Sequence, residues 1–287
     1  MANVYNGMVS GLSKIATGTP AAFCRKVSSA TITRSANNIR NAGIGGQLQV
    51  RKGTDEITLD MTCVGVSNTD LALWFPTTAG VQVASFPDFL VEVDDGSNGL
   101  EYVLSGGQPS SATITCSGGA SSQLEVQLQA KFTTATEQAA GTDVPVYNSV
   151  IGHTINDITV AQGTGTYGVL SFSLSCDLGT EMVNTMDGKS AASKTIPTSY
   201  IITTVNPSLT VETTDEWQMD TMDGDTWTAG NITITCANGV TAENSTITLT
   251  NWVPSELNIP LEAEGMVSFG HSFEPGSGTM YNRVTFS

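Results

Sequence analysis

Alternating apolar and polar residues predict that this chain is built mainly from β-strands. In the segment 122–131, SQLEVQLQAK, the apolar residues Leu124, Val126, Leu128 and Ala130 alternate with polar ones. A period of two places the apolar side chains on one face of a strand and the polar side chains on the other. Further strands are predicted at 27–33, 57–61, 89–93, 100–104, 112–116, 155–160, 169–176, 200–205, 209–213, 232–236 and 246–252.

Two segments have the pattern of a β-hairpin. The alternation that starts at Phe89 is interrupted by the turn sequence DDGSNG at 94–99 and resumes at Leu100. In the second segment, 47–61, the strands QLQV and ITLDM flank the turn sequence RKGTDE. Glycine with Asp or Asn between two strand-like runs is typical of a tight antiparallel connection. We therefore expect the two strands of each segment to be neighbours.

Several features of the first half recur in the second half in the same order. The strand 122–131 is echoed at 255–264, SELNIPLEAE, and the run ATITCSG at 112–118 is echoed by ITITCANG at 232–239. The strand 246–252 has no counterpart in this alignment and reads as an insertion. Repeated elements at unequal offsets are what two diverged copies of one domain produce when loops differ in length. We predict a duplicated domain.

Each half also contains a start signal for a short helix. Ser67 and Thr213 are each followed three residues later by a carboxylate, and a hydroxyl at the N-cap with a carboxylate in the first turn satisfies free backbone N–H groups. Pro76 and Gly224 end the two helical segments. The predicted fold class is therefore mainly β, with two tandem domains of β-sandwich or half-barrel type, each with one short flanking α-helix.

The boundary between the two copies is predicted near residue 144. The segment 133–144 has no apolar pattern, contains glycine and is followed by Pro145, so it reads as a linker. The first domain then comprises residues 1–144, whose first 26 residues suit an arm or a first edge strand, and the second comprises residues 145–287. A chain of 287 residues is long enough for two domains of ordinary size.

A long polar segment separates two strands of the second half. Between 177 and 199 the sequence shows no strand pattern, and a connection of that length is usually functional or disordered. In a protein that assembles, it would interlock with a neighbouring copy. The residues that we expect at such an inter-subunit contact are Thr185, Met186, Asp187, Gly188, Lys189, Ser190 and Lys194.

The chain is strongly acidic, and the charge is unevenly distributed. The formal net charge is −16, from 27 acidic and 11 basic residues. Residues 1–145 carry 12 acids and 8 bases, whereas the remainder carries 15 acids and 3 bases. Tight binding of nucleic acid needs Lys and Arg to replace phosphate counterions. An acidic chain of this kind could surround DNA without holding it.

The sequence has no sign of export, membrane insertion or metal binding. It lacks the apolar core of a secretory signal and any apolar run of membrane length, so we expect no membrane anchor. The five cysteines show no CxxC spacing, which favours small buried side chains in a reducing compartment over disulfides or metal ligands. We therefore expect no cofactor and no metal.

No set of residues suggests catalysis. His153 and His271 are isolated and read as structural, and the sequence has no P-loop, dinucleotide or nucleophile-elbow motif. The run DTMDGD at 220–225 resembles half of a calcium loop but lacks the ligand alternation and the distal Glu. We therefore expect the protein not to be an enzyme.

The order of these elements resembles that of the tail tube proteins of long-tailed bacteriophages. The resemblance lies in a strand, a capped helix with an aromatic residue, a hairpin, the run TITCSGG followed by LEVQLQAKF, and a Gly- and Thr-rich connection into PVYNSV at 145–150. In that family a hexameric ring of β-sandwich or half-barrel domains, each with a flanking helix, stacks into a tube. A tandem copy resembles the variant in which three chains form a ring of pseudo-sixfold symmetry.

The resemblance also implies a location, partners and a surface. The protein would be made and assembled in the host cytoplasm and would reside in the virion tail, where its partners would be other copies of itself, a tail terminator, a tape measure protein and distal tail proteins. DNA would pass through without specific binding. If the polar faces of the echoed strands line the channel, the lumen-facing carboxylates are Glu125, Glu256, Glu262 and Glu264; the alternative is that these faces point to solvent.

Three other functions are compatible with parts of the sequence. Another virion component, such as a decoration or baseplate protein, would use a β-sandwich to bind a surface. A carbohydrate-binding adhesin would stack sugar rings on tryptophans, and the candidates are Trp74, Trp217, Trp227 and Trp252. An enzyme is the third, but no nucleophile, base and orienting group can be assembled from the motifs.

Overall fold

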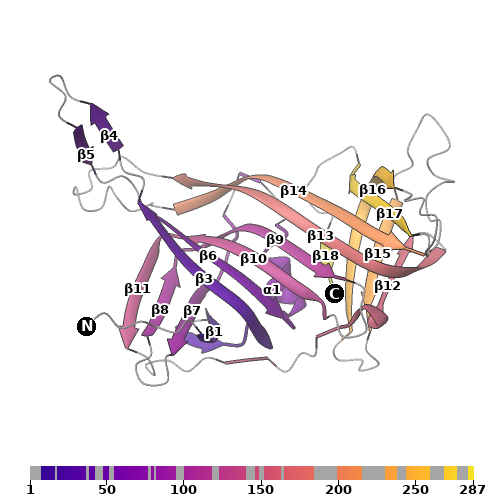
Figure 1. Ribbon diagram of the computed structural model, residues 1–287, viewed down its shortest axis with the longest axis horizontal. Helices are drawn as coiled ribbons and strands as arrows, with labels where there is room; N and C mark the ends of the chain where they lie inside the picture. The colour runs from indigo at the N-terminus through magenta and orange to yellow at the C-terminus, as the bar shows by residue number, and fades with distance from the viewer. Residues whose placement is uncertain are drawn as a thin grey trace.

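The protein is mainly β, as the alternation predicts, and its strands lie in two sheets and one separate hairpin (Figure 1). The computed structural model describes residues 8–16, 18–36, 39–42, 48–51, 55–76, 79–80, 82–94, 100–117, 123–139, 146–148, 152–162, 165–183, 199–214, 230–237, 244–258, 268–276 and 284–287.

The smaller sheet has five antiparallel strands in the order β11-β8-β7-β1-β2. They are β1 (Met8–Ala16), β2 (Thr19–Ala21), β7 (Asp88–Asp94), β8 (Leu100–Ser105) and β11 (Thr134–Ala139). The predicted hairpin at 89–104 is confirmed, since β7 and β8 are neighbours with Phe89 opposite Leu104. Residues 8–16 are an inner strand between β7 and β2 rather than an arm or an edge strand.

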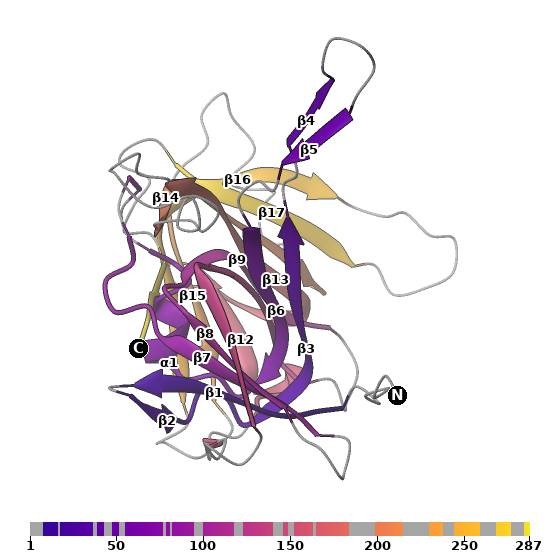
Figure 2. The same ribbon diagram turned by 90° about the vertical axis from the view of Figure 1, so that its left-hand side faces the viewer.

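The larger sheet has eleven strands, ten of them in the order β12-β15-β16-β17-β14-β13-β9-β10-β6-β3, with β18 paired to β16 (Figure 2). Because β12 also pairs with β13, the six strands from β12 to β13 close into a barrel. The strands are β3 (Lys26–Ala36), β6 (Asp55–Val64), β9 (Gln108–Cys116), β10 (Glu125–Phe132), β12 (Ile158–Gln162), β13 (Gly165–Val183), β14 (Ser199–Thr213), β15 (Gly230–Cys236), β16 (Ser245–Asn258), β17 (Phe269–Pro275) and β18 (Val284–Phe286).

The separate hairpin stands out from the body of the molecule (Figures 1 and 2). It consists of β4 (Ile39–Ala42) and β5 (Leu48–Arg51). The prediction that 47–61 is a hairpin is therefore wrong, because β5 pairs with β4 whereas β6 pairs with β3 and β10. The physical reason is strand length, because β3 pairs with all ten residues of β6, whereas β5 has only four residues that could pair with it.

The predicted linker at 133–144 is also wrong in part, because residues 134–139 form β11 and pair with β8. The strand lies at the edge of its sheet, where side chains are mostly exposed, so an apolar alternation is not needed to hold it in place. Threonines supply the β-branched character instead.

Six strand pairings of the first half recur in the second half, whereas the pairs β1-β2, β4-β5 and β12-β13 have no counterpart among the described residues. In the first half the pairs are β1-β7, β7-β8, β8-β11, β3-β6, β6-β10 and β10-β9. In the second half, the place of β1 is taken by β12, that of β3 by β13 and that of β6 by β14. The place of β7 is taken by β15, that of β10 by β17 and that of β11 by β18. The single strand β16 replaces both β8 and β9: its first part pairs with β15 and β18, and its last part pairs with β17.

Backbone irregularities recur at matching places. Gly106 and Asn251 both have positive φ, 67° and 61°. Gly106 lies where the chain leaves the smaller sheet for the larger, and Asn251 lies in β16 just before its partners change from β15 and β18 to β17. Each is followed three residues later by a proline, Pro109 or Pro254, and then by a register shift. A further register shift occurs near the start of both β3 and β13. Bulges are specific features of a strand pair and not random defects, so the correspondence extends to individual residues.

This correspondence differs from the one suggested by the sequence echoes. The segment 255–258 matches the part of β9 that follows Pro109, so its echo with 122–131 pairs strands that are not equivalent. The strand 246–252 is no insertion, because it occupies the place of β8. By the same pairings Thr213 matches Cys63 rather than Ser67. The boundary between the halves at residue 144 stays a prediction, since β9 and β13 hydrogen-bond across it in one continuous sheet.

The helix predicted at Ser67 is confirmed as α1 (Asn68–Ala72). The Ser67 hydroxyl accepts a hydrogen bond from the Asp70 backbone N–H at 3.2 Å and donates to the Asp70 carboxylate at 2.7 Å. Lys14 of β1 binds the same buried carboxylate at 2.6 Å and thereby ties the helix to the smaller sheet. The second predicted helix lies outside the described residues, and its predicted N-cap, Thr213, is the last residue of β14.

The core of the first half lies between the two sheets. Phe23 and Phe89 meet edge to face with ring centroids 5.0 Å apart, and Phe89 meets Phe132 of the larger sheet at 6.0 Å. Trp74, just after α1, packs against Phe86 at 5.1 Å. Burial of such rings is a large part of what stabilises a core. The apolar face of the larger sheet is thereby covered, which leaves its polar face open.

Candidate functional site

The open polar face of the larger sheet is the candidate functional site. Six residues from six neighbouring strands lie opposite one another in a row across it: Glu125, Thr115, Ser173, Thr210, Ser272 and Glu256. Opposite residues of antiparallel strands project to the same face. Glu125 and Glu256 therefore lie on one face of one sheet, and five strand spacings of ~4.8 Å place them about 24 Å apart along the curved sheet.

Two further rows run parallel to the first and are also polar. The Ser175 and Ser208 hydroxyls are 2.7 Å apart in one row, and Gln129 donates to the Asp60 carboxylate at 2.6 Å in the other. The face therefore presents hydroxyl, amide and carboxylate groups without an apolar patch. The rows are Ser29, Thr62, Gln127, Thr113, Ser175 and Ser208, and Thr31, Asp60, Gln129, Ser111, Asp177 and Asn206.

The charge of these rows is negative. Lys131 continues the polar side of β10, but its ammonium group lies 2.8 Å from the Glu56 carboxylate and also donates to the Thr180 carbonyl at 3.3 Å. Lys131 therefore adds no net positive charge to the face. The carboxylates that remain in the rows are Asp60, Glu125, Asp177 and Glu256, and Glu212, opposite Ser171, lies next to the first row.

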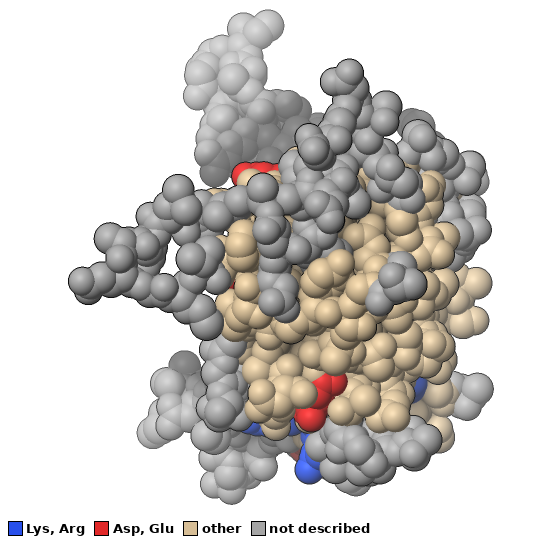
Figure 3. Space-filling model, turned by 90° about the vertical axis from the view of Figure 1, so that its right-hand side faces the viewer, with Lys and Arg blue, Asp and Glu red and all other residues tan. Residues whose placement is uncertain are grey.

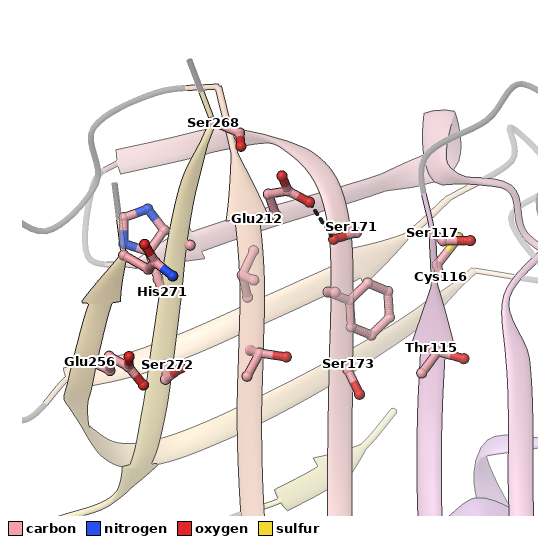
Figure 4. Close-up of a pocket in the computed structure, with 15 residues that line it drawn as sticks. Thr115, Cys116, Ser117, Ser171, Ser173, Glu212, Glu256, Ser268, His271 and Ser272 are labelled. Carbon is pink, nitrogen blue, oxygen red and sulfur yellow. Dashed lines mark hydrogen bonds between the residues drawn. The ribbon is translucent and has the colours of Figure 1, made fainter. Parts of the chain in front are cut away.

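A shallow groove of about 540 Å³ crosses the face between Glu212 and Glu256 (Figure 4). Glu212 accepts a hydrogen bond from the Ser171 hydroxyl at 3.0 Å. Gly270 lies on β17 between Glu212 of β14 and Asn258 of β16, and its missing side chain leaves the groove open. The remaining polar residues along the groove are Thr115, Ser117, Ser173, Thr210, Ser268 and Ser272.

His271 lies beneath the groove on the core side of β17. Its Nε2 atom is 3.0 Å from the Thr213 hydroxyl, and its ring stacks on Phe269 with centroids 6.5 Å apart. Burial lowers the pKa of His271 to about 4, so the ring is neutral at neutral pH. The structural role predicted for this histidine agrees with its 1% exposure.

The groove is lined mainly by hydroxyl, amide and carboxylate groups. Among the residues that the structure describes, no group of three His, Cys, Asp or Glu side chains could hold a metal ion. Burial raises the pKa of the Cys116 thiol to about 11 and of the Cys176 and Cys236 thiols to about 12, which leaves them protonated and unreactive at neutral pH. All five cysteines are free and buried, as the sequence predicts.

The predicted site residues are only partly described. Glu125 is half-buried and Glu256 exposed, on the same face. Glu262 and Glu264 lie outside the described residues. So do Thr185, Met186, Asp187, Gly188, Lys189, Ser190 and Lys194, and β13 continues to Val183, so the segment between β13 and β14 begins seven residues later than predicted.

Sequence reasoning missed three acidic residues of the face, Asp60, Asp177 and Glu212. Asp60 and Glu212 occupy polar positions in strands whose residues alternate between buried and polar, so this pattern could have identified them. Asp177 falls in the segment 177–199, which the sequence predicts as a polar connection, whereas it lies on β13.

The other side of the barrel differs in charge. The described parts of β12, β15 and β18, and of β16 as far as Val253, contain no Asp, Glu, Lys or Arg, and their outward positions are mostly threonine. Figure 3, which views the side where these strands lie in Figure 1, shows few charged residues among those described. The described strands of this side therefore lack the carboxylates that the polar face carries around the groove.

Comparison with models of known protein families and with characterised proteins gives no match. In the part of the chain that the structure describes, no helix has both the length and the apolar character needed to cross a membrane.

Proposed function

We propose that the chain is a structural subunit of a phage tail tube, in which three copies close into a ring of pseudo-sixfold symmetry and rings stack around a channel for DNA. The proposal is based on the resemblance of the sequence to tail tube proteins. In it, the chain works without a cofactor in the virion tail, with other copies of itself, a tail terminator, a tape measure protein and distal tail proteins as partners.

The observation that carries the proposal is a run of eight antiparallel strands whose two outer edges have no partner strand among the described residues. From β3 through β6, β10, β9, β13, β14 and β17 to the last part of β16, each strand is antiparallel to the next. Because neighbouring strands point in opposite directions and their number is even, the first and last strands of the run also point in opposite directions. The last strand of one copy can therefore run antiparallel to the first strand of the next copy. Closing a ring in this way removes exposed strand edges, which otherwise promote aggregation.

The polar face suits the wall of a DNA channel. Carboxylates such as Glu125, Glu256 and Asp177 repel phosphates, and the hydroxyl-rich rows between them hydrate well and offer DNA no base-specific contact. A wall of this kind lets DNA pass without holding it. The matching strand pairings of the two halves support the division of the chain into two tandem domains, which pseudo-sixfold symmetry requires.

Two of the four candidate tryptophans do not support the adhesin alternative. Trp74 and Trp252 are fully buried, so neither presents a ring to a sugar. A decoration or baseplate protein remains the second candidate within the virion, because a β-sandwich would serve it equally well.

Mass measurement at increasing concentration tests the proposed function. We expect the 30.0 kDa chain to form species of three chains and multiples of three, and to elongate into tubes as the concentration rises. A chain that remains monomeric at every concentration, and that also fails to extend preformed tube ends, would exclude the tube subunit.

A further inference from the structure

The two ends of the eight-strand run are open in the described part of the chain. There, β3 pairs only with β6, and the segment 253–258 of β16 pairs only with β17. The two strands run in opposite directions, and both carry exposed polar residues. In the proposed tube these edges meet between copies.

The chain already contains one junction between a strand of its first half and a strand of its second. At this junction β9 and β13 are antiparallel, with Thr113 opposite Ser175, Ala112 opposite Cys176 and Ser111 opposite Asp177. Ala112 and Cys176 are buried, whereas the other two pairs lie on the polar face. The Thr180 hydroxyl donates to the Pro109 carbonyl next to these pairs.

The open edge of β3 is the counterpart of the β13 edge at that junction. In β3 the register shift falls between Val27 and Ser29, and in β13 it falls between Val169 and Ser171. Counting from these bulges, Thr33 corresponds to Ser175, Arg34 to Cys176 and Ser35 to Asp177.

The open edge of β16 is the counterpart of the β9 edge. Here the reference points are Pro109 and Pro254, each followed by a bulged serine. Counting from them, Ser111 corresponds to Glu256, Ala112 to Leu257 and Thr113 to Asn258.

We propose that β16 of one copy pairs with β3 of the next copy in the register that β9 and β13 adopt within the chain. Asn258 then lies opposite Thr33 of the next copy, Leu257 opposite Arg34, and Glu256 opposite Ser35. The inference rests on the proposed function, because it supplies the residue-level contact through which the ring closes.

The chemistry of the resulting pairs agrees with their positions. Asn258 with Thr33 and Glu256 with Ser35 lie on the polar face, and the second pair repeats the carboxylate and serine combination of Asp177 and Ser111. Leu257 lies on the core side, against the stem of Arg34, whose guanidinium binds the Asp55 carboxylate at 2.6 Å. A shift of the register by one residue would place Leu257 or Glu256 opposite a residue whose side chain projects to the other face of the sheet.

Cysteine crosslinking tests this register. Opposite residues of antiparallel strands have Cα atoms about 4.5–5.5 Å apart, within the range that a disulfide spans. In the assembled double variant Thr33→Cys with Asn258→Cys, mild oxidation should link neighbouring chains covalently, up to closed trimers on a non-reducing gel. The native cysteines are buried and contribute little background.

Two controls make the outcome specific. Thr113→Cys with Ser175→Cys should crosslink within one chain whether or not the protein assembles. Thr31→Cys with Asn258→Cys is two residues out of register and should give about tenfold less intermolecular product, because disulfide geometry tolerates little displacement. Assembly with equal or greater linkage of the shifted pair would overturn the register alone. Absence of assembly in all variants and in the wild type would overturn the proposed function and, with it, this inference.

Discussion

Pro109 and Pro254 occupy equivalent positions in the two halves of the larger sheet. Each precedes a serine at which the strand register shifts, and each follows by three residues a residue with positive φ, Gly106 or Asn251. Proline lacks the N–H that a regular ladder needs and is tolerated at bulges. The pair therefore marks the place where the chain begins to pair with β10 in the first half and with β17 in the second.

Asn251 should be sensitive to the loss of its special backbone conformation. A left-handed φ of 61° suits Gly and Asn but strains other residues. We expect Asn251→Ala to lower the free energy of unfolding by about 1 kcal/mol. Asn251→Gly, which matches the residue at position 106, should come close to wild type. Urea unfolding of the unassembled chain measures both, and equal losses in the two variants would show that the side chain rather than the backbone matters.

Acidification should destabilise the barrel through His271. Its pKa is lowered to about 4 in the folded protein, whereas the unfolded chain has the ordinary value of 6.5. Between these values the unfolded state binds the extra proton, so the stabilisation is complete above pH 6.5 and falls as the pH drops towards 4. The loss should be on the order of 3 kcal/mol at most.

A matched variant isolates this contribution. His271 occupies the position that Leu128 holds in the first half, so His271→Leu places in the second half the residue of its counterpart. The difference in unfolding free energy between wild type and variant should vary with pH between about 6.5 and 4 and stay constant above. A difference that is independent of pH would contradict the assignment.

Reversing the charge of the polar face should make the tube retain DNA. We expect Glu125→Lys, on β10 and away from the proposed contact between copies, to leave assembly intact and to give binding of short duplex DNA that weakens steeply with salt, since phosphate contacts by lysine release counterions. In a phage, the same change and Glu256→Lys should slow or block DNA delivery. Glu137→Lys, on β11 of the smaller sheet, is the control that should not bind DNA inside the tube. Unchanged DNA passage in both face variants would count against a lumen position of this face.

The polar segment between β13 and β14 should be needed for contacts between copies. Deleting residues 188–195, which lie outside the described residues, removes most of the contact that the sequence predicts. We expect folded chains that form fewer or shorter tubes in electron micrographs. Wild-type yields of rings and tubes from the deleted protein would show that the segment does not interlock.

Local alternation was enough to predict most strands and the first helix. The strand at 125–132 buries Val126, Leu128 and Ala130 as the pattern requires, and Ser67 caps α1 with Asp70. In these segments the information lies within a few consecutive residues, because the two faces of a strand or the cap of a helix are local properties.

The pairing of strands could not be predicted in the same way. The segment 48–51 was correctly predicted as a strand but assigned the wrong partner, because partners are chosen by total buried surface rather than by the nearest turn. The sequence echoes misaligned the two halves for a related reason. Short runs such as TIT recur because β-branched residues suit many strands, whereas bulges and positive φ, which identify the equivalent positions, leave only weak marks in the sequence.

Reconstruction of the assembled protein by electron microscopy is the most direct test of the central claim. We predict hollow rings of three chains, in which the row from Glu125 to Glu256 faces the channel and β16 of each copy adjoins β3 of the next. An assembly with another number of chains, or one in which this row faces the outer surface, would contradict the account.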